Sequence, residues 1–195
     1  MPFASPLEVR QSSTISRWNA NDVHMTDTSD RRIVSSRHLA EGEGWEASEF
    51  EFGMIVAYNA FSRWMVKCMG AAGSSELGAL DILVLHNVNH RSRAKRLSDI
   101  CFLLNIEDTH TVNYALRKLS KVGLIDSEKR GKEVFHTTSE AGRALCDSYR
   151  KVRQRCLLEG LTRMDMTGDE LREIGAALRA LSGQYDQASR AASSL

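Results

Sequence analysis

The chain has 195 residues, which is enough for one domain with a buried core or for one domain with tails. Apolar residues make up 42% and charged residues 26%, and the formal net charge is only +1, so bulk charge points to neither a nucleic-acid nor a membrane partner. No apolar run approaches the roughly 18 residues that a membrane helix needs, and the N-terminus lacks a signal-peptide pattern, so a soluble cytoplasmic protein is expected.

Residues 1–46 are predicted to form a polar N-terminal arm that is partly disordered. Ser, Thr, Asp, Asn and Gly are frequent here, and apolar residues show little periodicity. Three arginines could touch a phosphate backbone (Arg31, Arg32 and Arg37). Four glutamates follow them closely (Glu41, Glu43, Glu46 and Glu49). A solvated tail is therefore the favoured interpretation.

Residues 47–72 are predicted to form a long N-terminal helix. Its apolar residues recur at spacings of four and three (Phe50, Met54, Tyr58, Phe61, Met65 and Cys68). This stripe is broader and more aromatic than one intramolecular partner usually requires. Part of it is therefore expected to contact a second subunit.

The next segment begins with Ser75 and Glu76, a typical helix start, and residues 76–90 are apolar nearly all round. A buried central helix is predicted. His86 and His90 lie one helical turn apart, a spacing that two metal ligands could use, but no third ligand is nearby and no metal is predicted. Four bases then precede a short helix (Arg91, Arg93, Lys95 and Arg96). The inner face of that helix carries Leu97, Ile100, Cys101 and Leu104.

The segment from Asn105 to Ile125 predicts an amphipathic helix with an unusual outer face. Its apolar residues share one side of a helical wheel (Val112, Ala115, Leu116, Leu119 and Val122). The opposite side holds cations and hydrogen-bonding groups without an acid (His110, Asn113, Tyr114, Arg117, Lys118 and Lys121). Glu107 and Asp108 precede the helix, where carboxylates cap free N–H groups. A helix face that only contacts solvent more often carries both positive and negative charges. On this helix alone, however, a solvated face and a ligand-binding face are about equally favoured.

The residues after this helix favour ligand contact. Gly123 is a helix stop, and two strand candidates, 124–128 and 133–138, flank a turn "KRGK" centred on Gly131. A helix pair followed by a basic hairpin has the order of a winged helix-turn-helix, here spanning 75–138. From Arg91 to Lys132, ten bases and five acids give a net charge of +5, which the near-neutral total conceals.

The C-terminal residues 139–190 are predicted to form two helices. The first starts at Ser139 and carries an apolar stripe (Leu145, Tyr149, Val152 and Cys156). The last has a seam with alternating spacings of three and four (Leu171, Ile174, Leu178, Leu181, Tyr185 and Ala188). Such a seam is typical of coiled coils and bundles, and a two-fold homodimer is favoured over packing within one chain.

This arrangement resembles the multiple-antibiotic-resistance regulator (MarR) family of winged-helix transcription factors. The resemblance covers about residues 48–188 and rests on "LSDICFLLNI", "TVNYALRKLSKVGLI" and "TSEAGRAL", with Gly142 at the family's glycine position. It implies a mainly α fold with a small β-hairpin wing, in which long N- and C-terminal dimerisation helices flank the winged helix-turn-helix. It also implies a homodimer that places the second helix of the motif in the major groove of DNA and the wing near the minor groove.

The resemblance assigns a set of DNA-contacting residues. The groove-facing group is His110, Thr111, Asn113, Tyr114 and Arg117. Lys118 and Lys121 are the expected phosphate contacts, and Arg130, Lys132, Arg93 and Lys95 are added from charge. Asn113 could pair with adenine and Arg117 with guanine, although either could hold a phosphate instead. The wing tip, "EKRGKE", is shorter than the family's usual acidic-Arg-Arg tip.

Two functions are therefore weighed. The first is a sequence-specific double-stranded DNA-binding transcriptional regulator acting as a homodimer. The alternative is a winged-helix interaction module whose basic face binds an acidic protein partner. A further hypothesis is a small-molecule effector in the dimer cleft, lined by Phe61, Trp64 and Met65, for which core packing is the favoured role.

No enzyme is expected, because the sequence has no phosphate-binding glycine loop, HExxH or GxSxG motif. The four cysteines form no CxxC pair, which argues against a zinc ribbon or a disulfide framework, and no cofactor is predicted. Cys156 lies beside Arg153 and Arg155, which could make a thiol reactive, but a helical core position is the favoured interpretation.

Overall fold

The computed structural model describes residues 32–164 and 166–195. The predicted disorder of the N-terminal arm falls mostly on residues 1–31, outside the described residues. The chain divides into two units, one ending at Val56 and one beginning at Ala57. Each unit is considered by itself.

The first unit contains a short 3-10 helix, η3 (Arg37–Leu39), and the start of the long helix α1 (Trp45–Ala72). The Arg32 guanidinium lies 4.3 Å from the centre of the Trp45 ring and donates a hydrogen bond to the Ala40 carbonyl. Ala40 is buried. The end of the predicted arm is therefore folded against the beginning of α1, and Arg32 has contacts within its own unit.

Helix α1 begins two residues before the predicted start at residue 47 and ends at Ala72 as expected. Gly73 follows with a φ of 118°, a left-handed conformation that stops the helix. In the second unit, Met65, Cys68 and Met69 are buried, whereas Tyr58 and Phe61 are exposed. The apolar stripe is thus only partly used by the core of the unit.

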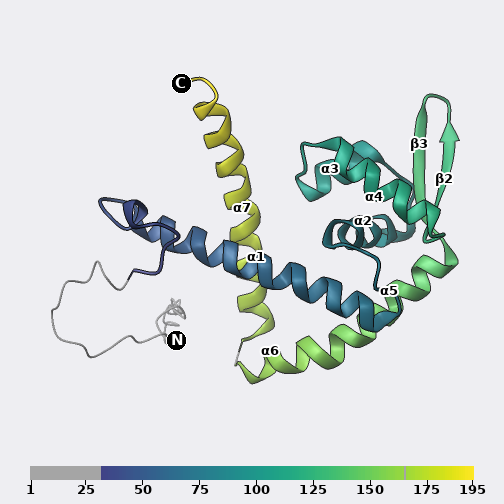
Figure 1. The fold of residues 1–195 in the computed structure, drawn as a ribbon, viewed down its shortest axis with the longest axis horizontal. Coiled ribbons are helices and arrows are strands. Elements are labelled where there is room, and N and C mark those ends of the chain that lie inside the picture. The colour runs from purple at the N-terminus through teal and green to yellow at the C-terminus, as the bar shows by residue number, and fades with distance from the viewer. Residues whose placement is uncertain (1–31, 165) are drawn as a thin grey trace, which may run out of the picture. The chain divides into compact units, whose positions relative to one another are not determined.

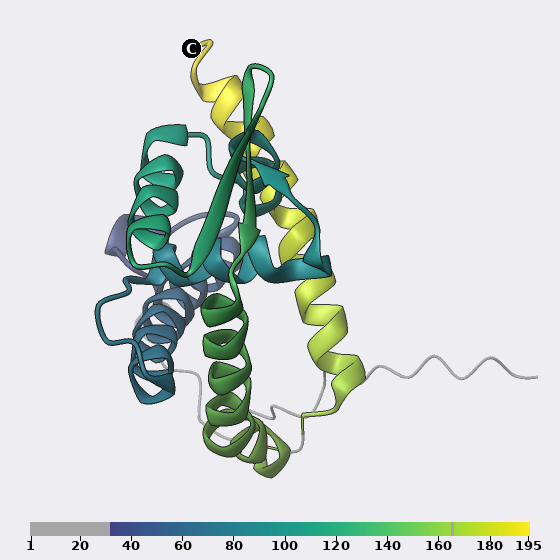
Figure 2. The ribbon, with the colours of Figure 1, turned by 90° about the vertical axis from the view of Figure 1, so that its right-hand side faces the viewer.

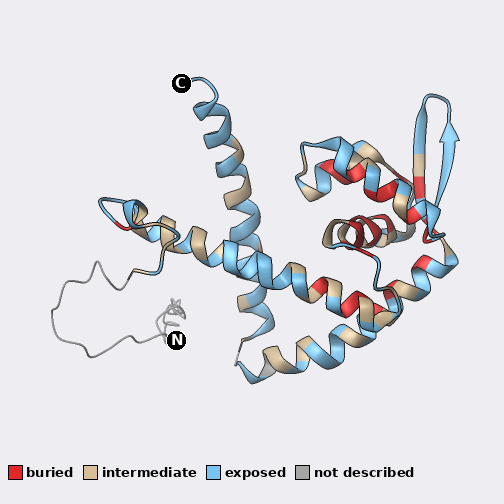
Figure 3. Ribbon diagram, viewed as in Figure 1, coloured by how far each residue is buried: buried red, intermediate tan, exposed pale blue. Residues whose placement is uncertain are grey.

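The helix-turn-helix core consists of α2 (Ala79–Asn89), α3 (Leu97–Leu104) and α4 (Thr109–Lys121). Helix α2 is central, and the buried positions concentrate in α2, in α4 and at the C-terminal end of α1 (Figure 3). The predicted central helix, 76–90, begins only at Ala79 because Asp81 Oδ2 accepts a hydrogen bond from the Gly78 N–H at 2.8 Å and caps the first turn. The predicted inner face of α4 is confirmed, except that Val122 is exposed.

The connection from α3 to α4 is fixed by two local features. Asn105 adopts a left-handed conformation with a φ of 52° and ends α3. Asp108 Oδ1 accepts a hydrogen bond from the His110 N–H at 2.9 Å and caps α4, so the predicted capping role of this acid is confirmed.

The sheet has three strands, β1 (Lys95–Arg96), β2 (Ile125–Arg130) and β3 (Glu133–Thr138), in the order β1-β3-β2. Both pairings are antiparallel. Arg130 pairs with Glu133, so the hairpin turn is tight, and Gly131 there has a φ of 63°. The β2–β3 hairpin, the predicted wing, projects past the neighbouring helices (Figure 2). Strand β1 was not predicted, because a strand of two residues is too short to show alternating apolar and polar side chains.

The base of the wing is fastened directly to α5 (Glu140–Arg153). The Ser139 N–H donates to the Leu124 carbonyl at 3.1 Å, and the Ser139 hydroxyl donates to the Gly123 carbonyl at 2.7 Å. Gly142 packs so closely here that a Cβ atom would lie 2.1 Å from the Leu124 carbonyl oxygen. Only glycine fits at this position without a backbone shift.

The chain then continues from α5 through a π-helical stretch, Gln154–Leu158, into α6 (Glu159–Arg163), as Figure 1 shows. The predicted core position of Cys156 is wrong, because Cys156 is exposed. An α-helical wheel places side chains every 100°, and the wider π-helical turn breaks that progression after Arg153.

The last helix, α7 (Gly168–Ala192), is capped by Thr167, whose hydroxyl accepts a hydrogen bond from the Glu170 N–H. None of its described residues is buried, and the predicted seam is half-exposed at Leu171, Ile174, Leu178 and Tyr185. Among the described helices, none has the length and apolarity required to cross a membrane.

Candidate nucleic-acid interface

Helix α4 presents its polar face outward because Val112, Leu116 and Leu119 hold the opposite face in the core. The exposed residues on α4 include five of the predicted contacts (His110, Thr111, Tyr114, Arg117 and Lys121). Asn113 is half-buried at the edge of this face. The Thr111 hydroxyl donates to the Asp108 carbonyl at 2.8 Å, so this side chain also closes the first turn.

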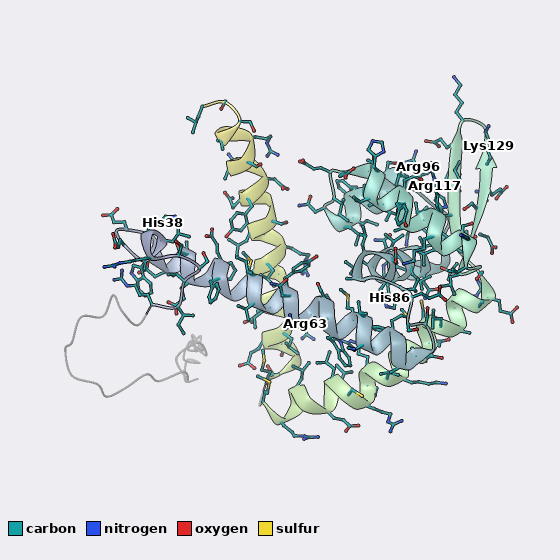
Figure 4. The ribbon with its side chains drawn as sticks, viewed as in Figure 1. His38, Arg63, His86, Arg96, Arg117 and Lys129 are labelled. Carbon is teal, nitrogen blue, oxygen red and sulfur yellow. The ribbon has the colours of Figure 1, made fainter. Side chains whose placement is uncertain are left out.

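A groove with a volume of about 830 Å³ separates α4 from the wing. Its walls come from the beginning of α3, from one edge of α4 and from strands β2 and β3. The groove brings together Asn113, Arg117 and Lys121, three of the predicted contacts. Arg96 and Arg117, labelled in Figure 4, both line this groove. The groove thus combines an amide with three cationic side chains.

Lys118 is placed differently from the prediction. Its Nζ lies 2.6 Å from Asp81 Oδ2 and 2.7 Å from the Glu76 carbonyl oxygen. Asp81 is buried, with only 9% of its side chain exposed. The ammonium group therefore neutralises a buried carboxylate on α2, and the predicted phosphate contact by Lys118 would require this internal ion pair to open.

Lys95 cannot contact DNA in this fold, and the prediction for it is corrected. Only 1% of the residue is exposed. Its Nζ donates hydrogen bonds to the carbonyls of Asn87 and His90 at the C-terminal end of α2, where unpaired carbonyl groups attract a cation. Burial lowers the pKa of Lys95, with the nearby Arg93 and Arg91 adding to the effect. Arg93 itself is exposed.

The wing supplies fewer unpaired cations than its sequence suggested. Arg130 lies 2.6 Å from Glu128 and stacks over the Phe135 ring at 5.0 Å. Glu128 in turn has a lowered pKa because it accepts hydrogen bonds from Arg130. Lys129 and Lys132 are exposed near the turn. Lys132 is therefore better placed than Arg130 to meet an external phosphate.

Arg96 lines the groove although it was not among the predicted contacts. Its Nη1 donates to Glu133 Oε1 at 2.8 Å, and its Nη2 donates to Asp99 Oδ1 at 3.1 Å. These hydrogen bonds raise the pKa of Arg96 and lower that of Asp99. No sequence pattern reveals the pairing with Glu133, because β1 and β3 meet only in the folded chain.

The two histidines considered as metal ligands have other surroundings. His86 packs edge-on against the Tyr149 ring, with centroids 4.6 Å apart, and burial lowers its pKa. His90 is exposed. Within residues 32–164 and 166–195, no three side chains of His, Cys, Asp or Glu gather as a metal site.

The three residues predicted to line an effector cleft differ in how far they are buried. Met65 is buried in the core and Trp64 packs against it, so core packing is confirmed for both side chains. Phe61 is exposed on α1.

Comparison with known proteins agrees with this geometry. Residues 77–142 match a family model described as a winged helix DNA-binding domain. No curated protein sequence matches the chain.

Several solved structures have a similar fold. AbfR of Staphylococcus epidermidis has 16% sequence identity and a TM-score of 0.59, covering 72% of this chain and 92% of that one. A Staphylococcus aureus MarR in complex with salicylate and kanamycin has 15% identity and a TM-score of 0.57, covering 74% and 95%. A MarR-family transcriptional regulator from a Rhodococcus species has 12% identity and a TM-score of 0.57, covering 69% and 93%.

Residues 77–142 therefore match a winged helix domain, and the chain has the fold seen in the MarR-type structures. The predicted resemblance and the predicted fold class are confirmed at the level of the fold. Both the α4 helix and the wing fall within the matched residues, so the groove is part of the winged domain.

Proposed function

We propose that the protein is a sequence-specific double-stranded DNA-binding transcriptional regulator that acts as a homodimer. The observation that carries this proposal is the groove between α4 and the wing. Arg117 and Lys121 line it from one turn of α4, with Asn113 beside them. An exposed helix with this outer face has the dimensions and the donor groups that enter a DNA major groove.

The side chains divide into two roles. The Asn113 amide has a donor and an acceptor that match the edge of adenine. The Arg117 guanidinium has a planar fork of donors that matches the edge of guanine. Lys121, Lys132 and Arg93 carry flexible or exposed charges that suit phosphate oxygens. His110, Thr111 and Tyr114 complete the groove-facing set. Together these residues supply affinity through phosphates and sequence preference through one helix.

A homodimer is supported by the seam on α7. Leu171, Ile174, Leu178 and Tyr185 are 39–48% exposed in the single chain. An aligned row of half-exposed apolar side chains is stabilised when a second copy covers it. Two-fold symmetry would also place two α4 helices on successive turns of the duplex.

We also propose that the protein binds a small-molecule effector. One of the similar structures is a MarR protein in complex with salicylate and kanamycin. In this chain, the exposed Phe61 of α1 is the remaining candidate from the predicted cleft. We further propose a cytoplasmic location, since the function requires access to DNA.

The proposal is tested by selection from fragmented genomic DNA with the full-length protein. Bound fragments should share a sequence motif and should bind about 10³-fold or more tightly than random duplex at physiological salt. A paired variant, Arg117→Ala with Lys121→Ala, should lose this selection. A charge-matched variant, Lys151→Ala with Arg155→Ala, removes exposed cations outside the groove and should retain it.

Genomic fragments that bind no better than random duplex would overturn the proposal. Binding to an acidic protein together with absence of DNA selection would favour the interaction-module function instead. Because both interfaces are electrostatic, salt dependence alone would not separate them.

A further inference from the structure

The Arg96 guanidinium is the one groove cation held between two carboxylates among the described residues. Asp99 accepts from Nε at 3.3 Å and from Nη2 at 3.1 Å, while Glu133 accepts from Nη1 at 2.8 Å. Arg96, Arg117 and Glu133 all line the groove. A cationic group is therefore present beside Arg117, but its hydrogen-bond donors are directed at acids of the same chain.

The two carboxylates hold Arg96 in different ways. Asp99 also accepts the Arg96 backbone N–H at 3.0 Å and caps the first turn of α3, so it belongs to the helix start. Glu133 comes from the first position of β3 and reaches Arg96 across the strand pair. About half of the Glu133 side chain is exposed, at 51%. Glu133 is therefore the carboxylate that an external anion can replace.

A phosphate oxygen pair and a carboxylate present the same geometry to a guanidinium group. Under the proposed function, a DNA backbone lying in this groove would come close to the Glu133 carboxylate beside Arg96. The carboxylate would repel a phosphate there. The phosphate could accept hydrogen bonds from Arg96 only after the Arg96–Glu133 pair had opened.

We propose that Glu133 is an internal substitute for a DNA phosphate at Arg96, and that release of this pair sets the affinity of the groove for the DNA backbone. The inference rests on the proposed DNA-binding function and adds a latent phosphate contact to it. Because phosphate contacts carry no sequence information, the pair lowers affinity for every duplex and leaves base preference unchanged.

The test measures DNA binding of the full-length protein as a function of salt concentration. Glu133→Gln removes the competing charge and keeps the side-chain length. Affinity for both a selected and a random duplex should rise about two- to fivefold, as expected for one exposed charge pair. The plot of log affinity against log salt should become steeper by about 0.9, the value for one additional phosphate contact.

Two further variants identify the cause. Asp147→Asn removes a carboxylate that pairs with Arg150 on α5 and changes the net charge by the same amount, so it should leave affinity unchanged. Arg96→Gln combined with Glu133→Gln removes the cation that the single substitution frees. The gain in affinity should then disappear. Thermal unfolding of each variant confirms that the fold is retained.

The outcomes separate the two proposals. If the unaltered protein does not bind duplex DNA, the proposed function fails and this inference fails with it. If the protein binds but Glu133→Gln changes neither affinity nor salt dependence, only this inference is overturned. If the gain persists when Arg96 is also replaced, Glu133 acts by simple repulsion and the role of Arg96 as a latent phosphate contact is wrong.

Discussion

Lys118 Nζ on α4 lies 2.6 Å from Asp81 Oδ2 on α2, and this ion pair joins the outward-facing helix to the central helix of the domain. The same Asp81 oxygen accepts the Gly78 N–H that begins α2. One carboxylate oxygen therefore caps one helix and holds a second. The position of α4, and with it the aim of Arg117, depends on a charge pair that faces into the domain.

Lys118→Met should destabilise the fold more than it weakens DNA contacts. The substitution retains the aliphatic packing but leaves the buried Asp81 carboxylate without its cation. The free energy of unfolding should fall by about 1–3 kcal/mol, measured by denaturant unfolding. The salt dependence of DNA binding should remain unchanged, and a salt slope reduced by about 1 would show that Lys118 leaves Asp81 to contact a phosphate.

Lys121→Met is the matched control on the same helix. Lys121 is exposed and lines the groove. Its replacement should change the free energy of unfolding by no more than about 0.5 kcal/mol. It should weaken binding to all duplexes and reduce the salt slope by about 1. The two lysines, three residues apart, are thus expected to give opposite results in the two measurements.

Arg117→Ala should weaken binding to the selected DNA by about 1–3 kcal/mol and relax the preference at one base position. The physical reason is the loss of a forked donor that reads a base edge. The measurement is a comparison of affinities for the selected duplex, its single-base variants and random duplex. An equal loss on selected and random DNA would make Arg117 a phosphate contact and remove its base-reading role.

Leu178→Asp should convert the proposed dimer into monomers. A charge in the middle of the α7 seam has to lose water when the seam is covered, which strongly disfavours association. Light scattering coupled to size exclusion should show half the mass of the unaltered protein. Ala176→Asp adds the same charge to an exposed position on the opposite side of α7 and should leave the mass unchanged. An unaltered mass for Leu178→Asp would exclude this seam from the interface.

Acidification should destabilise the fold through two histidines, the buried His136 and the half-buried His86. Burial lowers the pKa of His86 and of His136 in the folded chain, so the unfolded chain takes up protons first as pH falls. Their contribution to stability is complete above the ordinary histidine pKa of about 6.5 and is lost as pH falls through the lower folded-state values.

His86→Phe should reduce this pH dependence. The His86 Nε2 atom is buried without a hydrogen-bond partner among the described residues, so a proton added there has no acceptor. Denaturant unfolding at pH 7.5 and 5.5 should show a smaller stability loss in the variant, by up to about 1 kcal/mol. His90→Gln alters an exposed ring and should leave the pH dependence as it was. An equal effect of both variants would contradict the role of burial.

The sequence predicted those features that depend on neighbours along the chain. The apolar period of α4, the cap at Asp108 and the turn at Gly131 are all local, and each is found in the structure. The order of helices and hairpin was enough to predict the winged fold.

The partners of long charged side chains could not be predicted in the same way. A helical wheel gives the direction of the Cβ atom, but Lys118 has a flexible stem that reaches back to Asp81, 37 positions earlier in the sequence. Lys95 departs from the rule that lysine stays at the surface, because the carbonyls at the end of α2 provide it with buried acceptors. Of the bases counted as surface charge, Lys95 is thus buried and Lys118 is paired with a buried carboxylate.

The contact at Gly142 also ties α5 directly to the base of the hairpin. A Cβ atom there would overlap the Leu124 carbonyl, so the backbones of α5 and of the chain entering β2 touch without an intervening side chain. No flexible side chain lies between these two backbones to take up a displacement of α5. A tilt of α5 must carry the base of the hairpin with it, and the long hairpin enlarges that tilt at its tip. Small displacements of α5 are therefore expected to reach Lys129 and Lys132 through the base of the hairpin.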